Sequence, residues 1–359
     1  MSIFSTSRDR PKVSICLPTC NRPELIVECI DSCLGQTYDN LEIVIGDDSR
    51  DARTAQLVAA RYAQEPRVRY TLNQPPLGQA RNVASLFERA SGDKILLIHD
   101  DDLLTIDGVE KLVSLWQLHP QLDAAFGDQY EADHDGTIDF DASARLNAAF
   151  RRTQDAQGLQ PLAGRTGLIQ MFPNNGWMAN ADLVKRIGYN EQYGICCDFV
   201  FGSELCLAAR EVFYLHDYVS VYRKTATSVS HSTRGTASAA PVSAYGFVKA
   251  LTLPPQLEAS RRLALRRLVP IVVSVHARNR QTWAGVKIAL SHLFAYNYGF
   301  SARLYYHLLM LARAGLSVRR QAVAAAAVAA VAAAPAVADP AAVVKELVND
   351  LVTDRSEPV

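Results

Sequence analysis

Residues 94–104, KILLIHDDDLL, decide the fold class, because a short apolar run there ends directly in three adjacent aspartates. The run predicts a buried strand. Three similar runs precede it and alternate with segments whose apolar residues recur at helical spacing; they lie at 12–17, 41–45 and 68–72. Strands that alternate with helices are typical of an α/β fold, with a mostly parallel sheet and helices on both faces.

Three of the predicted strands end in polar clusters, namely PTCNR at 18–22, GDDS at 46–49 and HDDD at 99–102. The carboxyl ends of parallel strands meet at one edge of the sheet, which is where α/β proteins bind their ligands. Any one cluster has the composition of an ordinary turn. Three of them at the same edge predict a binding site.

The aspartates Asp100, Asp101 and Asp102 repel one another and are costly to hold together without a cation. Mg²⁺ and Mn²⁺ prefer oxygen ligands and often use one or two carboxylates plus the phosphates of a substrate. The alternative is a solvated acidic turn that caps the next helix. The position directly after a buried strand favours the divalent metal site.

Two further side chains suit a nucleotide. Asp48 follows the second strand, where a carboxylate can accept a hydrogen bond from the N–H of uracil or thymine; the alternative is an N-cap for the following helix. Arg81 follows Gly78 in a predicted helix and suits a diphosphate or the face of a base. An ordinary exposed arginine is the alternative for Arg81.

Taken in order, these motifs resemble the family 2 glycosyltransferases of the GT-A fold. The resemblance covers about residues 12–225 and rests on VSICLPTCNR, Gln36-Thr37-Tyr38, Asn73, Gly78, Arg81-Asn82 and GDKILLIHDDDL. It implies an inverting enzyme with a nucleotide-sugar donor and a divalent metal, Mn²⁺ or Mg²⁺. The positions that match nucleotide-binding residues of the family are Pro18, Thr19, Asn21, Arg22, Asp48, Arg81 and Asp100. Asp101 is the first candidate for the metal ligand, and Asp102 is the second.

The resemblance also implies a catalytic base. YGICCDFVFGSEL, residues 193–205, resembles the family segment that carries the base, and Asp198 is the match. Asp198 would take the proton of the acceptor hydroxyl. A helix N-cap is the alternative for Asp198, and Glu204 is the fallback base.

Three more positions are weaker candidates. The family often has aspartate where this chain has His99, which is either a tolerated variant beside the ribose or a spare ligand; we favour the first. Arg223 and His231 match a closing loop near the diphosphate. An edge-strand arginine with no ligand role is an equal alternative for Arg223.

We expect a catalytic domain at residues 1–235, with a nucleotide-sugar half at 12–130 and an acceptor half at 131–235, followed by a helical region at 236–359. Within these parts, the polar residues 131–168 predict loops, and the small-residue stretch 231–244 predicts a linker. The stretch 322–342 is rich in alanine. Its uncharged part approaches the length of a membrane span, but Pro335 and the alanines favour a packed or frayed helix.

The formal net charge of zero hides an asymmetry. Residues 241–320 carry 12 Lys or Arg and one Asp or Glu, whereas residues 1–240 carry 23 Lys or Arg and 31 Asp or Glu. Basic helices with aromatic residues favour an anionic membrane surface. Packing on the catalytic core, or a homo-oligomer interface, is the alternative. The basic block has no recognised reader motif, so we expect no nucleic acid partner.

The seven cysteines lack the spacing of a metal site, and the N-terminal residues lack the apolar core of a secretory signal. We therefore expect a cytoplasmic enzyme, peripheral at the inner membrane face, with UDP or dTDP as the favoured nucleotide. Its acceptor would be a glycan or a lipid-linked glycan in cell-surface polysaccharide synthesis. The alternative is a non-catalytic nucleotide-sugar or glycan-binding module of the same fold. A sugar nucleotidyltransferase is disfavoured, because PTCNRPEL lacks the glycines of a triphosphate loop.

Overall fold

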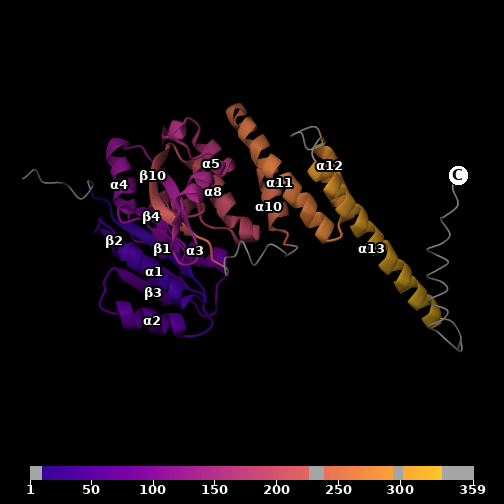
Figure 1. Cartoon of the computed structure of the whole chain (residues 1–359), viewed down its shortest axis with the longest axis horizontal. Coiled ribbons are helices and arrows are strands. Elements are labelled where there is room, and N and C mark those ends of the chain that lie inside the picture. The colour runs from indigo at the N-terminus through magenta and orange to yellow at the C-terminus, as the bar shows by residue number, and fades with distance from the viewer. Residues whose placement is uncertain (1–9, 226–237, 294–301, 334–359) are drawn as a thin grey trace, which may run out of the picture. The chain divides into compact units, whose positions relative to one another are not determined.

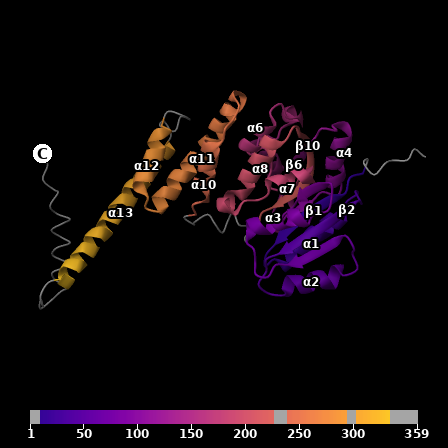
Figure 2. The same cartoon turned by 180° about the vertical axis from the view of Figure 1, so that it is seen from behind.

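The computed structural model describes residues 10–225, 238–293 and 302–333. The chain divides into two compact units, Met1–Leu265 and Arg266–Val359, and each is described by itself. In the described residues, the first unit is built on one ten-stranded sheet (Figures 1 and 2). Its strands are β1 (Val13–Thr19), β2 (Leu41–Asp47), β3 (Val68–Leu72), β4 (Lys94–Leu97), β5 (Leu103–Leu104), β6 (Ala124–Ala132), β7 (Ile138–Asp139), β8 (Gly158–Leu159), β9 (Trp177–Asn180) and β10 (Val212–Arg223).

The sheet has the order β3-β2-β1-β4-β9-β6-β10-β5, with β7 beside β6 and β8 beside β10. The first four strands of this order are parallel to their neighbours. Strand β9 is antiparallel to both β4 and β6, and β10 runs parallel to β6. The prediction of a mostly parallel α/β sheet is confirmed for the long strands. The sequence did not indicate β9 or the two-residue strands β5, β7 and β8, which are all antiparallel to their neighbours.

Helices cover both faces of this sheet. They are α1 (Pro23–Leu34), α2 (Arg53–Tyr62), α3 (Gln79–Arg89), α4 (Gly108–Leu118), α5 (Phe140–Ala149), α6 (Ala163–Leu168), α7 (Ala181–Ile187), α8 (Cys197–Ala208) and α10 (Ala240–Ala250), with the short 3₁₀ helices η2 (Gln154–Ala156), η3 (Glu191–Cys196) and η4 (Pro255–Leu257). Helix α11 (Glu258–Arg278) begins in this unit and ends in the second.

Two buried clusters form the core, one on each face of the sheet. Because side chains alternate along a strand, Ile15 and Leu17 of β1 face α1, α2 and α4, whereas Cys16 faces α3. The cluster that contains Cys16 continues to α7 and α8 through Trp177 and Phe201, whose rings lie 5.3 Å apart. All seven cysteines are free.

Two predictions about the elements are wrong. Residues 131–168 contain α5 and α6, and two polar side chains of α5 are buried and hydrogen-bonded: Ser143 donates to the Asp139 carbonyl and Asn147 to the Gln129 carbonyl. Such anchored polar residues weaken the apolar periodicity. Residues 231–237 of the predicted linker lie outside the described residues, but the stretch is helical from Ala240, where Pro241 occupies a first-turn position that tolerates proline. The alternative of an edge-strand arginine at Arg223 is not supported, because β10 lies between β6 and β5.

The second unit is helical, as predicted. After the end of α11 it contains α12 (Thr282–Ser291) and α13 (Ala302–Ala333). A Cβ on Gly285 would lie 2.5 Å from Leu311, so α12 and α13 pack closely at this glycine. In the part of the chain that the structure describes, no helix combines the length and apolar character that a bilayer-spanning segment requires.

Candidate active site

The loops after β1 and β4 are joined by hydrogen bonds at the carboxyl edge of the sheet. Thr19 Oγ1 donates to Asp100 Oδ2 over 2.7 Å, and Arg22 Nη1 donates to Asp100 Oδ1 over 2.8 Å and to Asp101 Oδ2 over 3.1 Å. Burial raises the pKa of Asp100, and the Arg22 guanidinium opposes that effect. The predicted nucleotide residues Thr19, Arg22 and Asp100 are thus in direct contact.

The loop after β1 also contacts the loop after β2. The backbone N–H of Asn21 donates to Ser49 Oγ over 2.7 Å, and the Cys20 thiol donates to the Asp48 carbonyl over 3.5 Å. Asn21 adopts a left-handed backbone with φ of 55°, which turns the chain from β1 into α1. Pro18 lies opposite Gly46 in the parallel pair of strands. The three polar clusters therefore form one continuous site.

Asp48 is buried, and its carboxylate anchors the chain before α3. Oδ1 accepts from Asn73 Nδ2 at 2.8 Å and from Leu77 N at 3.0 Å, and Oδ2 accepts from Gly78 N at 2.7 Å. Ala52 occupies the N-cap of α2, so Asp48 does not cap the following helix. Arg81 is exposed and forms an ion pair of 2.8 Å with Glu191 of η3, which links α3 to the segment before α8.

Arg223, the last residue of β10, contacts the turn that carries Asp100, Asp101 and Asp102, called the aspartate turn below. Its backbone N–H donates to Asp102 Oδ1 over 2.8 Å, its Nε donates to the Asp101 carbonyl over 2.7 Å, and its guanidinium pairs with Glu28. Thr225 Oγ1 donates to Asp101 Oδ2 over 3.2 Å. Only 1% of the Arg223 surface is exposed. Arg223 is therefore a buried part of this site and not an exposed edge-strand residue.

Asn175 connects His99 to Asp102, and sequence reasoning missed it. Its Nδ2 donates to Asp102 Oδ2 over 2.6 Å and lies 2.9 Å from His99 Nδ1. Because an amide nitrogen can only donate, Nδ1 of His99 accepts, and its proton resides on Nε2. Neither ring nitrogen then has a free lone pair for a metal, which favours the role of His99 beside the donor.

The turn that carries Asn175 depends on the glycine after it. Gly176 has φ of +72°, and a Cβ there would lie 2.5 Å from Ser220 Oγ of β10. Sequence reasoning overlooked this turn because β9 has only four residues and shows no alternating pattern. The dipeptide Asn174-Asn175 before a glycine was the available signal, and it also fits an ordinary turn.

The aspartate turn fits a divalent cation. Carboxylate oxygens of Asp101 and Asp102 lie within 4.8 Å of each other. Burial and the neighbouring Asp101 raise the pKa of Asp102 to about 7, which reflects the cost of holding two adjacent carboxylates in this turn. Within residues 10–225, 238–293 and 302–333, no group donates to Oδ1 of Asp101. A free oxygen beside a second carboxylate suits Mg²⁺ or Mn²⁺.

Asp198 lies in the first turn of α8. Cys196 occupies the N-cap, so Asp198 does not cap this helix. Tyr189 OH donates to Asp198 Oδ1 over 2.8 Å, and burial together with the Asp198 charge raises the Tyr189 pKa well above its usual value, which keeps the phenol protonated as a donor. Glu204 is half-buried on the same helix, and burial raises its pKa. His231 lies outside the described residues.

Comparison with known proteins identifies the family. The family described as glycosyl transferase family 2 matches residues 14–174. Glycosyltransferase GlyG of Streptococcus pneumoniae is 30% identical over 225 residues, which cover 60% of this chain and 72% of that protein. Chondroitin synthase of Escherichia coli is 31% identical over 135 residues, or 37% of this chain. The chain spans only 19% of that synthase, and 14% of an uncharacterized Sinorhizobium fredii protein that is 34% identical over 131 residues.

Solved structures share the fold. TarS of S. aureus, residues 1–349 in complex with UDP-GlcNAc, is similar with a TM-score of 0.59 at 16% identity, over 86% of this chain and 92% of that one. The mannosyltransferase PcManGT of Pyrobaculum calidifontis, in complex with GDP-Man and Mn²⁺, has a TM-score of 0.51 at 17% identity over 85% of each chain. The protein therefore belongs to glycosyl transferase family 2, as a glycosyltransferase enzyme with the GT-A fold.

Proposed function

We propose that the enzyme transfers a sugar from UDP or dTDP to a hydroxyl of a glycan or lipid-linked glycan, with inversion at the anomeric carbon. The observation that carries this proposal is the continuous set of contacts among the loops after β1, β2 and β4, with one carboxylate oxygen of Asp101 that no described residue contacts. Residues 12–130 would bind the donor, and residues 131–235 would bind the acceptor.

Donor recognition would use one cation and one carboxylate. Arg22 is largely buried beside Asp100 and suits a diphosphate. Among the described residues, Asp48 Oδ2 accepts only the Gly78 N–H, and its remaining lone pair suits the N–H of uracil or thymine. The UDP-GlcNAc complex of the structurally similar TarS supports a uridine donor.

Asp101 would be the principal ligand of Mn²⁺ or Mg²⁺, and Asp102 the second. Such an ion would supply positive charge next to the leaving diphosphate. Arg223 and Asn175 orient Asp102 through both of its oxygens, so the two carboxylates cannot turn apart. The Mn²⁺ complex of the structurally similar PcManGT supports this assignment.

Asp198 would act as the base. Tyr189 donates to Oδ1, and no described residue donates to Oδ2, which leaves that oxygen for a proton. The acceptor oxygen would bond to the anomeric carbon on the face opposite the diphosphate while the bond to the diphosphate breaks. The hydroxyl proton would pass to Asp198. One displacement of this kind inverts the anomeric configuration.

Calorimetry with UDP, dTDP and GDP, each with Mn²⁺ and with EDTA, tests the donor site. We expect UDP or dTDP to bind more tightly than GDP, and only with the metal. Asp101→Ala should abolish this binding, whereas Asp107→Ala, which removes a carboxylate at the start of α4, should not. Full activity in EDTA would contradict the metal part of the proposal.

We propose that the second unit binds the anionic inner face of a membrane. Exposed residues recur on one side of α12, namely Trp283, Lys287 and Leu290. A similar stripe on α13 consists of Tyr305, Leu309, Arg313 and Leu316. Basic side chains between exposed aromatic and aliphatic ones are typical of interfacial helices. A Campylobacter jejuni relative, 32% identical over 104 residues and covering 34% of that protein, is named for a lipid-linked acceptor, GalNAc(5)-diNAcBac-PP-undecaprenol.

Co-sedimentation with phosphatidylglycerol vesicles tests this surface. Binding should fall with salt and about fivefold in Lys287→Gln, since each basic residue contributes about 1 kcal/mol at such a surface. Trp283→Ala should weaken it further, whereas Arg53→Gln in the first unit should not. Absence of binding at low salt, together with a concentration-dependent dimer in sedimentation, would assign the stripes to an interface between copies.

A further inference from the structure

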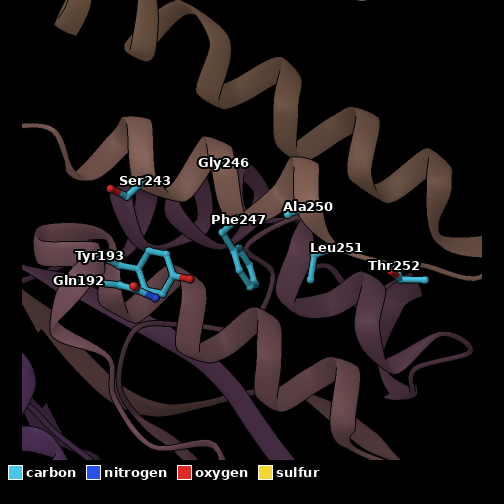
Figure 3. A pocket seen from close by; sticks show the side chains of 8 residues that line it. All are labelled: Gln192, Tyr193, Ser243, Gly246, Phe247, Ala250, Leu251 and Thr252. Atoms are coloured by element: carbon cyan, nitrogen blue, oxygen red, sulfur yellow. The ribbon is translucent and has the colours of Figure 1, made fainter.

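A shallow cavity of about 550 Å³, open to solvent, lies between η3 and α10 in the first unit (Figure 3). Gln192 and Tyr193 line it from η3, Ser243 and Phe247 line it from α10, and Thr252 follows that helix. Its volume is within the usual range of small-molecule sites, about 300–1,000 Å³. None of these residues belongs to the donor site described above.

The wall formed by η3 continues directly into the turn that carries Asp198. Helix η3 ends at Cys196, and Asp198 follows two residues later in the first turn of α8. Glu191, next to Gln192, forms the ion pair with Arg81. One short segment, residues 191–198, thus contacts α3 beside the donor site, lines the cavity and carries the proposed base.

A glycine holds this segment against α10. Gly194 has φ of +47°, and a Cβ there would lie 3.2 Å from the Cβ of Ala240, the first residue of α10. A larger residue would be strained by its backbone and would push the two walls of the cavity apart. The geometry of the cavity therefore depends on this close approach.

The chemistry of the lining suits an uncharged, hydroxyl-rich ligand. No charged side chain lines the cavity, so the diphosphate of the donor would find no cation there. The rings of Tyr193 and Phe247 lie 5.7 Å apart at 67°, and Figure 3 shows the Gln192 amide beside the Tyr193 ring. Across residues 10–225, 238–293 and 302–333, nothing hydrogen-bonds the side-chain polar groups of Gln192, Tyr193, Ser243 or Thr252.

We infer that this cavity is an acceptor subsite, which binds an uncharged sugar unit of the acceptor glycan while another unit presents its hydroxyl to Asp198. The inference rests on the proposed function. Aromatic rings would cover the apolar face of the sugar, and the free amide and hydroxyl groups would bond its hydroxyls. These side chains are exposed or half-buried, so water bonds them in the free protein; sugar hydroxyls can replace that water, whereas an alkyl or isoprenoid chain cannot, which disfavours a lipid tail.

Saturation-transfer NMR and competition binding test the subsite with three neutral probes, chitotriose, cellotriose and maltotriose, and with farnesol as a lipid probe. At least one trisaccharide should bind the full-length protein. Tyr193→Ala and Phe247→Ala should each weaken that binding about tenfold, the usual scale for a well-packed aromatic contact. Tyr306→Ala, which removes an exposed ring on α13 in the second unit, should leave it unchanged. UDP affinity with Mn²⁺ should stay the same in all three variants.

Three results would overturn the subsite. The wild type could bind none of the trisaccharides, or Tyr193→Ala and Phe247→Ala could bind trisaccharide as tightly as the wild type. The third is that the wild type binds farnesol and these two variants lose that binding. Circular dichroism of both variants excludes misfolding as the cause of lost binding. Failure of the wild type to bind UDP contradicts the proposed function instead, so the two failures are distinguishable.

Discussion

Replacement of Asn175 by alanine tests the architecture of the metal site at a residue that touches neither donor nor acceptor in the proposal. The single Asn175 amide donates to the buried Asp102 carboxylate over 2.6 Å and to His99 over 2.9 Å. A hydrogen bond to a charged group contributes about 1.5–3 kcal/mol, and one to a neutral group about 1 kcal/mol. Since Asp102 is only 2% exposed, water cannot easily replace the lost donor.

We expect Asn175→Ala to lower the free energy of unfolding by about 3 kcal/mol, or about 6–12 °C in Tm for a domain of this size. Thermal unfolding in EDTA measures this effect without any contribution from bound metal. Partners that orient a metal ligand typically change metal affinity by about 10–100-fold. Calorimetry should therefore show a loss of that size in Mn²⁺-dependent UDP binding.

Asn174→Ala is the matched control, because Asn174 is the adjacent asparagine and its side chain is exposed. This control should unfold at the wild-type temperature and bind UDP normally. Asn175→Asp should be worse than alanine, since it places an acceptor and a further negative charge against Asp102. The reasoning fails if Asn175→Ala binds Mn²⁺ and UDP like the control, or if Asn175→Asp is tolerated.

Three other predictions follow from the site and the sheet. Asp198→Asn should keep donor binding and lose transfer by about 10²–10⁴-fold, and a near-normal kcat would move the base to another residue. Proton NMR of the first product from an α-linked donor should show a β linkage, and an α linkage would exclude single displacement. Burial would raise the pKa of Glu42, but hydrogen bonds from Ser14, Ser91 N, Arg69 and Lys12 prevail and lower it from 4.5 to about 2. Because the pKa of Glu42 is lower in the folded state, Glu42 stabilises the fold above about pH 4.5 and loses that effect as the pH falls toward 2. Glu42→Gln should therefore lower the free energy of unfolding by about 3 kcal/mol at pH 7 and by little at pH 2. Denaturant unfolding at both pH values measures the difference.

Sequence reasoning identified the first four strands because their apolar runs are bounded by sharp polar turns. The structure begins and ends these strands within two residues of the predicted positions, and β1 continues through Pro18 to Thr19. Proline fits there because the pairing of β1 with β4 ends at Cys16 and Leu97, which leaves that side of β1 without a strand partner at Pro18 among the described residues. Local patterns thus sufficed wherever burial of the strand was the dominant signal.

The second half of the sheet was less visible in the sequence. Strand β6 carries Asp128, Gln129 and Glu131 among its residues, and all three are buried and hydrogen-bonded or ion-paired. Buried polar side chains resemble loop residues when no tertiary partner is known. The contact between Asn175 and Asp102 spans 73 positions, so no local pattern contains it.

The place of β9 has a consequence for how the chain reaches its native state. This strand lies between β4 and β6, although it comes about fifty residues after β6 begins. A chain that has grown only through β6 leaves β4 without its second neighbour, and the backbone beside Ile95 and Leu97 forms an open edge. We therefore expect a fragment of residues 1–130 to aggregate rather than fold, and the sheet to unfold in one cooperative step. During synthesis, β4 cannot pair with β9 until the chain has been made through residue 180. This long-range pairing should make folding of the enzyme slow and dependent on protection of the open edge of β4.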